Sequence, residues 1–346
     1  MAGAEASHSN LVASPSPDLF FDTINAYQRT AAVRAAVHLD LFTAIDEGAR
    51  SVPAIATRCT ASERGVRVLC DYLTIIGFLR KTGDVYELTP DTAMFLSRRS
   101  PAFQGTTVDF LASPEMMRNF DTLTATIRRG TIAPTNNNTV DDDNPIWVQF
   151  AYAMTPMMRP RAEEIADILG VSSAGPLRVL DIAAGHGIFG IVLAQRNPRI
   201  EVVAVDWAAV LAVAHQNAVS MGVADRHRLL IGDAMKVEYG TGFDVALITN
   251  FLHHFDRATC VSFLRKVAAA LQPGGRAVIL EFVPNDDRIS PPAAAAFSMT
   301  MLGGTPSGDA YTFAELQGMA IEAGFASAVA HPAPPQTIIV ATKQPR

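Results

Sequence analysis

The feature that most constrains the fold of this chain is a strand, turn and helix pattern that repeats from residue 177 onward. Short apolar runs alternate with helical stretches such as 208–221 and 259–271; the runs are LRVLDI, EVVAVD, RLLIGD, DVALIT and RAVILEF. Units of this kind build a largely parallel sheet with helices on both faces, and ligands bind where the strands end. We therefore expect an α/β, Rossmann-like domain over residues 176–346, with its functional residues directly after the strands.

The N-terminal third has a different pattern. Residues 20–44 keep helical spacing but are apolar on more than one face, and residues 51–79 predict two short helices that begin near Ser51 and Ser62. The segment LRKTGDVYELTP then predicts a hairpin that turns at Gly83 and Asp84. Helix, helix and hairpin in this order form a winged helix. We expect this mainly α domain over residues 18–115, after a flexible tail at residues 1–17.

The charge of the expected winged helix argues against DNA binding. Residues 1–115 carry 10 Lys and Arg against 13 Asp and Glu, and the whole chain has a formal net charge of −6. A protein whose affinity rests on phosphate contacts needs a broad positive surface. The second short helix carries an apolar stripe instead, although any helix shows such a stripe to its own core. The sequence therefore predicts no nucleic-acid partner and favours dimerisation through this domain.

A polar segment rich in Pro and Asn, TIAPTNNNTVDDDNP at residues 131–145, predicts a break between two domains. The helical stretch that follows it is rich in Trp, Phe, Tyr and Met. This composition suits either an interdomain core or an apolar lid over a planar ligand, and the sequence leaves both open. We assign residues 116–175 to a linker and a helical lid.

The cysteines and the N-terminus are typical of a reducing compartment. Cys59, Cys70 and Cys260 are far apart and form no CxxC pair, so they predict neither a disulfide framework nor a zinc ribbon. The N-terminus lacks a basic start and an apolar core region, and no apolar run approaches the ~20 residues of a membrane span. We expect a cytoplasmic protein without a membrane partner.

The first strand-to-helix turn, AAGHGIFG, fits two cofactors. Gly185, Gly187 and Gly190 match the G-x-G-x-x-G pattern of dinucleotide-binding proteins, and Asp206 lies near the offset of their ribose-binding acid. However, a carboxylate at Asp181, which ends the first strand, would repel a bound pyrophosphate. It suits a ligand with cationic groups, such as the ammonium and sulfonium of S-adenosylmethionine, unless Asp181 only caps the turn.

Together these motifs resemble the class I S-adenosylmethionine-dependent methyltransferases, specifically the small-molecule O-methyltransferases with an N-terminal winged-helix dimerisation domain. The segment ALQPGGRAVILEF, with its Gly274-Gly275 turn, is typical of methyltransferases. The resemblance begins at about residue 20 and implies a mostly parallel seven-stranded sheet, a homodimer, and methyl transfer that releases S-adenosylhomocysteine. It also implies the cofactor-binding residues Asp181, Gly185, Gly187, Asp206, Trp207, Gly232, Asp233, Ala234 and Asn250.

The segment NFLHHFD contains a candidate general base. In the family, a histidine after the fourth strand has this role, and the resemblance places His253 at that position, with Glu281 as the acid that orients its ring. A phenol has a pKa near ~10 and a histidine near ~6.5, so the unaided proton transfer is uphill by roughly 5 kcal/mol. Orientation and coupling to methyl transfer must therefore cover the difference.

The chain departs from the family at two positions near this base. The Asp that usually follows the catalytic histidine is His254, and the family's second acid falls at Ala310, next to Asp309 as a candidate substitute. Because the orienting network is altered, transfer to carbon or nitrogen stays open beside transfer to a phenolic or enolic hydroxyl. An NAD-dependent oxidoreductase and a winged-helix regulator are the more distant alternatives.

The last expectations concern metal and substrate. His254 and Cys260 lie near His253, but no third histidine or carboxylate cluster follows in a ligand spacing, so we expect no metal. Aromatic and thioether side chains favour a flat, apolar acceptor, such as an aromatic or polyketide-like metabolite. The candidate substrate-binding residues are Phe20, Tyr27, Phe150, Met154, Met157, His254, Met299 and Met301.

Overall fold

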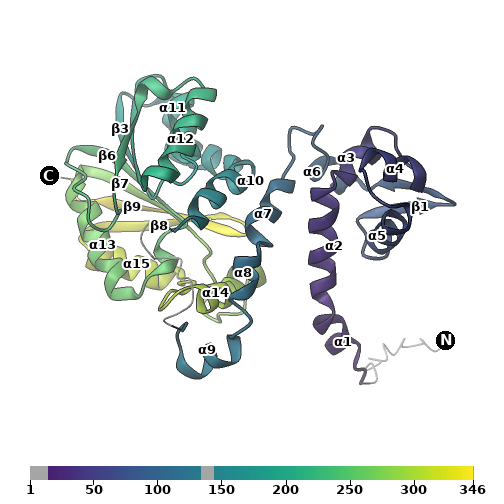
Figure 1. Cartoon of the computed structure of the whole chain (residues 1–346). Coiled ribbons are helices and arrows are strands. Elements are labelled where there is room, and N and C mark those ends of the chain that lie inside the picture. The colour runs from purple at the N-terminus through teal and green to yellow at the C-terminus, as the bar shows by residue number, and fades with distance from the viewer. Residues whose placement is uncertain (1–14, 134–143, 346) are drawn as a thin grey trace, which may run out of the picture. The chain divides into compact units, whose positions relative to one another are not determined.

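The computed structural model describes residues 15–133 and 144–345, and the chain divides into two compact units, residues 1–101 and 102–346 (Figure 1). The sequence placed the end of the first domain near residue 115, whereas residues 102–115 group with the second unit. Most of the predicted tail and most of the predicted break at 131–145 lie outside the described residues. No helix in the described ranges is long and apolar enough to cross a membrane.

The N-terminal unit contains the predicted winged helix. Its elements are α1 (Asp18–Ile24), α2 (Ala26–His38), α3 (Leu41–Asp46), α4 (Val52–Arg58), α5 (Glu63–Ile75), β1 (Leu79–Thr82), β2 (Val85–Leu88) and α6 (Pro90–Phe95). The strands β1 and β2 form the antiparallel wing. At the start of α5, the Ser62 side chain accepts a hydrogen bond from the Gly65 N–H and so caps the helix.

The single helix predicted over residues 20–44 was wrong, because the structure divides this stretch into α1, α2 and α3. The chain breaks at Asn25 and again at Asp40, where φ is 55°. This left-handed conformation cannot continue a helix, and Asp is among the few non-glycine residues that adopt it at modest cost. Helical spacing of apolar residues persists across such a break, which is why the spacing alone does not reveal it.

The second unit is built around the predicted seven-stranded sheet, with strand order β5-β4-β3-β6-β7-β9-β8. The strands are β3 (Leu177–Ile182), β4 (Ile200–Asp206), β5 (His227–Ile231), β6 (Phe243–Thr249), β7 (Leu271–Glu281), β8 (Phe325–Ala333) and β9 (Gln336–Lys343). Strand β9 runs antiparallel to both neighbours, and the remaining pairs are parallel. The expected α/β fold with a mostly parallel sheet is thus confirmed.

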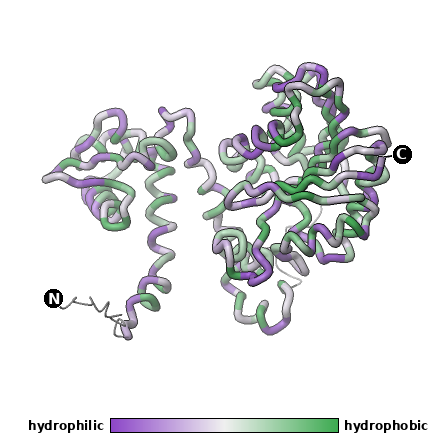
Figure 2. Tube along the Cα trace, turned by 180° about the vertical axis from the view of Figure 1, so that it is seen from behind, coloured by the Kyte–Doolittle hydropathy of each residue, from purple (hydrophilic) through white to green (hydrophobic). Residues whose placement is uncertain are grey.

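Helices cover both faces of this sheet. The helices of this unit are η1 (Gly105–Thr107), α7 (Val108–Leu111), α8 (Pro114–Arg118), α9 (Leu123–Arg129), α10 (Ile146–Ile168), η2 (Val171–Ser173), α11 (Ile188–Arg196), α12 (Ala208–Ser220), η3 (Ala224–Arg226), η4 (Leu252–His254), α13 (Arg257–Ala270), α14 (Pro292–Gly304) and α15 (Phe313–Glu322). Successive strand residues point to opposite faces. Leu180 therefore packs with α13 and α15, whereas its neighbour Val179 packs with α10 and α11. Figure 2 shows hydrophobic residues concentrated along the central strands.

The sheet order determines where a ligand would bind. Strand β3 lies between β4 and β6, so the chain's path across the sheet reverses at this strand. In open α/β sheets the carboxyl ends beside such a reversal form the ligand-binding crevice. The glycine-rich turn follows β3, Asp206 ends β4, the histidine pair follows β6, and Glu281 ends β7. All four features therefore belong to one edge of the sheet.

Candidate active site

The glycine loop, residues 183–187, connects β3 to α11. Gly185 and Gly187 have φ values of 56° and 72°, in the left-handed region that favours glycine. A Cβ atom at Gly187 would also lie 3.0 Å from the Cβ of Ala214 on α12. The loop thus needs glycine for its backbone conformation and, at Gly187, for its close approach to the neighbouring helix.

Two acids flank this loop. Asp181 is fully buried: its Oδ2 accepts the Gly190 N–H at 3.0 Å, and its Oδ1 has no hydrogen-bond partner among the described residues. Asp206 is partly buried and accepts the N–H groups of Gly185 and Trp207, both at 2.8 Å. Burial disfavours the charged form and raises the pKa of Asp181 to about 7 and that of Asp206 to about 6. A cationic ligand would favour ionisation of both.

The other cofactor candidates after β5 are tied into their local turn. Gly232 has a φ of 153°, and its N–H donates to the Asp206 carbonyl at 3.0 Å, which joins the ends of β4 and β5. The Asp233 carboxylate pairs with Lys236 at 2.8 Å. Ala234 is buried, and its carbonyl accepts the Lys266 ammonium at 3.2 Å. This turn is therefore an ordered part of the same sheet edge.

The remaining two cofactor candidates also contact neighbouring elements. Asn250 follows β6 with a left-handed φ of 55°, and its Oδ1 accepts a hydrogen bond from Gln336 Nε2 at 2.5 Å. Trp207 is partly buried and packs against a small cluster formed by Ala151 of α10 and Val210 and Val213 of α12. These contacts place both residues at the predicted edge, although the Asn250 side chain is occupied by a protein partner.

His253 and Glu281 are in direct contact. His253 lies on η4 after β6, Glu281 ends the adjacent strand β7, and both side chains are buried. His253 Nδ1 is 2.5 Å from Glu281 Oε2, while Glu281 Oε1 accepts the N–H groups of Phe251 at 3.0 Å and Leu252 at 2.8 Å. One carboxylate thus holds both the imidazole and the backbone of the turn that carries it.

His254 belongs to a row of rings that leads to the glycine loop. Its ring centroid lies 4.3 Å from that of His253 and 5.3 Å from that of Trp147. Trp147 contacts Phe150 edge to face, and Phe150 stacks on His186 of the glycine loop with centroids 5.9 Å apart. Burial lowers the pKa of His254 well below its ordinary value, so this imidazole is neutral.

The methionine candidates occupy different environments. Met154 is buried in the core between α10 and the sheet, and Met157 packs against the same core. This face of α10 therefore belongs to the core, as one of the two interpretations of its composition expected. A role for these two methionines in substrate binding stays a prediction. On α14, Met301 is buried and Met299 is exposed.

Phe20 and Tyr27 lie in the N-terminal unit. Each side chain is exposed there, Phe20 on α1 and Tyr27 on α2. Their predicted role in substrate binding stays a prediction.

Asp309, the candidate substitute for the family's second acid, pairs with another residue. Its Oδ2 lies 3.5 Å from Arg288 Nη1 and its Oδ1 accepts the Ala310 N–H at 2.8 Å. Ala310 itself is fully buried. Sequence proximity to the expected position made Asp309 a candidate, but its pairing with Arg288 depends on the fold.

Two residues at the site were not anticipated from the sequence. Phe297 of α14 lies edge to face with His253, with centroids 4.8 Å apart, and stacks on Phe282. His186 accepts the Ile188 N–H on its Nδ1 at 3.2 Å, and burial lowers its pKa to about 4. The position of His186 inside the glycine loop was a usable signal, whereas nothing in the apolar sequence of α14 singles out Phe297. Within residues 15–133 and 144–345, no three His, Cys, Asp or Glu side chains gather as metal ligands would.

Two family models match the chain: an O-methyltransferase domain over residues 140–326 and an O-methyltransferase dimerisation domain over residues 21–98. A 3-hydroxy-5-methyl-1-naphthoate 3-O-methyltransferase from Streptomyces sahachiroi is 26% identical over 314 residues, which cover 89% of this chain and 89% of that protein. Acetylserotonin O-methyltransferase from Mus musculus is 26% identical over 329 residues, which cover 88% of this chain and 82% of that protein.

Solved structures agree with these matches. A structure described as an O-methyltransferase from Nostoc punctiforme is 50% identical and superposes with a TM-score of 0.91. The superposition covers 96% of this chain and 100% of that chain. Human N-acetylserotonin methyltransferase, solved in complex with S-adenosylmethionine, shares the fold at 20% identity, with a TM-score of 0.82 over 97% of this chain and 99% of that chain. The O-methyltransferase model alone spans more than half of the sequence. The chain therefore belongs to the family of S-adenosylmethionine-dependent small-molecule O-methyltransferases.

Proposed function

We propose that the protein methylates a phenolic or enolic hydroxyl of a small aromatic or polyketide-like metabolite, with His253 as general base and Glu281 as the residue that orients it. The contact between His253 Nδ1 and Glu281 Oε2 at 2.5 Å carries this proposal. A carboxylate only accepts hydrogen bonds, so Nδ1 holds the proton and Nε2 keeps its lone pair. Nε2 is then the atom that removes the proton of the acceptor hydroxyl, and Glu281 stabilises the imidazolium that forms.

The surroundings of His253 keep its ring in one orientation. Phe297 packs edge to face against the ring, and the His254 ring lies beside it with centroids 4.3 Å apart. The neutral state of His254 avoids a second positive charge next to the imidazolium. Geometry of this kind supplies much of the rate when a hydroxyl and an electrophile must meet in line.

The residues at the glycine loop fit the family's cofactor. S-adenosylmethionine, when bound, supplies a methyl group on a positively charged sulfur. Asp181 presents a buried, unpartnered Oδ1 beneath the loop, and an ionised carboxylate there favours a cation nearby. Asp206, whose carboxylate now accepts two backbone N–H groups, would hold the ribose hydroxyls, and Gly185 and Gly187 would let the backbone approach the ligand.

Asp206→Ala should weaken the binding of S-adenosylhomocysteine about 10- to 100-fold, because charge-assisted hydrogen bonds are worth roughly 1.5–3 kcal/mol. Isothermal titration calorimetry measures this affinity, and NAD should show no binding. Asp225→Ala is the matched control, since the Asp225 side chain is 77% exposed and belongs to η3. Binding of NAD without binding of S-adenosylhomocysteine would instead favour an oxidoreductase.

An aromatic acceptor agrees with the row of ring contacts from His254 through Trp147 to Phe150. Flat ligands stack on such side chains or contact their edges. The names of two relatives, a hydroxynaphthoate and an acetylserotonin O-methyltransferase, support the same class of acceptor. The residues of the second unit that we assign to acceptor binding are Phe150, Met154, Met157, His254, Met299 and Met301.

The acceptor class is tested by incubating the protein with labelled S-adenosylmethionine and a panel of phenols, enols and keto acids. We expect methyl ethers as products, identified by mass spectrometry and NMR. A hydroxynaphthoate and the same naphthoate without its hydroxyl form a matched pair, and only the first should accept the label. Label on carbon or nitrogen would redirect the proposal to another transfer within the same fold.

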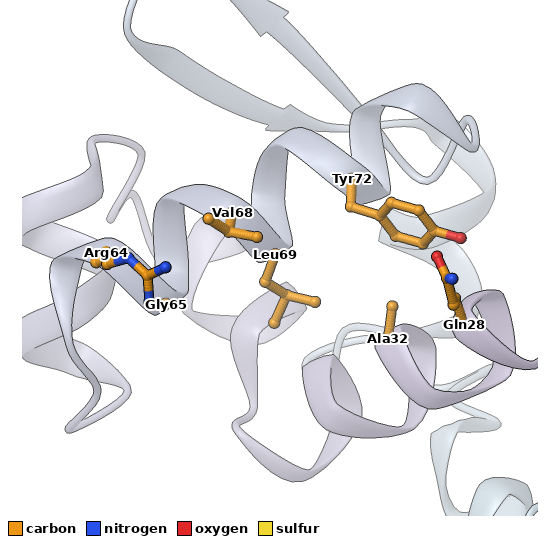
Figure 3. A pocket seen from close by; sticks show the side chains of 7 residues that line it. All are labelled: Gln28, Ala32, Arg64, Gly65, Val68, Leu69 and Tyr72. Atoms are coloured by element: carbon orange, nitrogen blue, oxygen red, sulfur yellow. The ribbon is translucent and has the colours of Figure 1, made fainter.

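We also propose that two copies associate through the N-terminal unit, which matches the dimerisation model. Helix α1 contributes no buried residue, and Leu19, Phe20 and Phe21 are all more than half exposed. A pocket of about 350 Å³ lies between α2 and α5 (Figure 3); it is lined by Gln28, Ala32, Arg64, Gly65, Val68, Leu69 and Tyr72. Exposed apolar side chains such as those of α1 are what an interface between copies would bury.

Sedimentation at micromolar concentration should therefore detect a dimer, and Phe21→Asp should shift it toward monomer because a charge would be buried at the interface. Val329→Asp on β8 is the matched control, since Val329 is 53% and Phe21 52% exposed. A wild-type chain that stays monomeric would contradict the proposal.

A further inference from the structure

We propose that Tyr311 and Gly308, in the connection between α14 and α15, are positioning residues that hold His253 in place through the backbone of its turn. The inference rests on the proposed function of His253 as the base. We define the histidine turn as residues 252–255. The Tyr311 hydroxyl donates to the carbonyl of Phe255, the last residue of this turn, at 2.6 Å.

The histidine turn is held by side chains on both its N–H and its carbonyl groups. Glu281 accepts the N–H of Leu252 on one side. On the other, the Cys260 thiol donates to the Leu252 carbonyl at 3.2 Å and Tyr311 donates to the Phe255 carbonyl. Tyr311 is 9% exposed, and burial raises its pKa, so the hydroxyl keeps its proton and remains a donor. The turn therefore has little freedom to tilt the imidazole.

Gly308 packs closely against the backbone of His253 and His254. A Cβ atom at this position would lie 2.2 Å from the His253 carbonyl oxygen and 3.0 Å from the His254 carbonyl carbon. The Gly308 N–H donates to Thr305 Oγ1 at 2.8 Å, and this hydroxyl in turn donates to the Met301 carbonyl at the end of α14. Gly308 is thus held to the end of α14, and its lack of a side chain lets the histidine turn approach closely.

These contacts matter more here because the family's second acid is absent. Ala310 occupies its place and Asp309 pairs with Arg288, so no second carboxylate from this connection steadies the imidazole. Tyr311, the next residue along, acts on the backbone instead of on the ring. A displacement of about 1 Å at a reacting group costs about 10²-fold in rate, so a backbone anchor of this kind is sufficient to matter.

Tyr311→Phe keeps the buried ring and removes only the hydroxyl. With the panel acceptor that gives the highest turnover, we expect kcat to fall about 10-fold while the KM for S-adenosylmethionine stays unchanged. Tyr86→Phe is the matched control: it removes another buried tyrosine hydroxyl, which bonds Asp71 at 2.7 Å in the other unit, and should lower stability without changing kcat.

Gly308→Ala is a second variant, and we expect it to lower kcat at least as far because the added methyl must displace the His253 carbonyl. Gly318→Ala is its control, since a Cβ at Gly318 on α15 meets no atom within 4 Å. A measurement without an acceptor supports both variants: the NMR signal of the His253 Nδ1 proton, assigned by its loss in His253→Gln, should shift in Tyr311→Phe and Gly308→Ala and stay unchanged in Tyr86→Phe and Gly318→Ala.

A double-mutant cycle separates positioning from general stability. If Tyr311 acts through His253, Tyr311→Phe should cause no further loss of rate in a His253→Ala background, because the group it positions is gone. An equal loss in both backgrounds would overturn the inference. It would also be overturned if Tyr311→Phe left both kcat and the Nδ1 signal unchanged while His253→Ala lowered kcat as expected. Full activity of His253→Ala would instead overturn the proposed function itself.

Discussion

Replacing His253 by alanine is expected to lower turnover by roughly 10²- to 10⁴-fold, the usual contribution of a general base. The affinity for S-adenosylhomocysteine should stay almost unchanged, because His253 follows β6, whereas the glycine loop follows β3 and Asp206 ends β4. The imidazole contacts Glu281 on β7, His254 on η4 and Phe297 on α14, which are elements other than the glycine loop. Single-turnover kinetics with the preferred acceptor, together with calorimetry, measure the two effects separately.

His254→Ala is the matched variant for this experiment, because it removes the neighbouring buried imidazole of the same turn. We expect a much smaller loss, mainly in acceptor affinity, since the His254 ring contacts Trp147, whereas the His253 ring contacts Glu281. If His254→Ala were the inactive variant, or if His253→Ala kept near-full activity at neutral pH, His253 would not be the base. Positioning of an already acidic acceptor would then be the better mechanism.

Glu281→Gln should reduce kcat by at least about 10²-fold, although the new side chain has nearly the same volume. The Glu281 carboxylate accepts three hydrogen bonds, from His253 Nδ1 and from the N–H groups of Phe251 and Leu252. A glutamine amide offers one oxygen and one NH₂ group, so in either orientation a donor faces a donor. If the NH₂ faces Nδ1, the proton moves to Nε2, and the base loses its lone pair.

The same substitution should lower the free energy of unfolding by about 1–3 kcal/mol, because a buried donor loses its acceptor. Thermal and denaturant unfolding measure this loss. Glu201→Gln on β4 is the control: the Glu201 side chain is 54% exposed and 3.9 Å from Arg228, so neither stability nor kcat should change noticeably. In a His253→Ala background Glu281→Gln should still destabilise the fold but should no longer affect the rate. A variant with wild-type kcat would show that Glu281 does not set the tautomer.

The order of elements could be predicted because it depends on local spacing. Apolar runs of strand length, separated by helical stretches, required a parallel sheet, and the sheet in turn required the functional residues to follow the strands. The pairing of His253 with Glu281 was implied by the family resemblance, and it agrees with the same logic, since adjacent parallel strands end at one edge. The hairpin at Gly83 was equally local, because the turn residues lie between the two strands that they join.

Other features depend on partners that are remote in sequence. Tyr311 bonds a carbonyl 56 residues away, and Asp309 pairs with Arg288 instead of serving the base. The break at Asp40 interrupts an apolar spacing that by itself predicts one helix. Met154 lies in the core, although the composition of its helix, α10, equally suited a lid. Periodicity specifies which side of an element is apolar or polar, but it does not specify which surface that side will meet. The sequence alone therefore determined the sheet and the edge at which the proposed base lies, whereas only the tertiary packing decided which side chains hold that histidine in place.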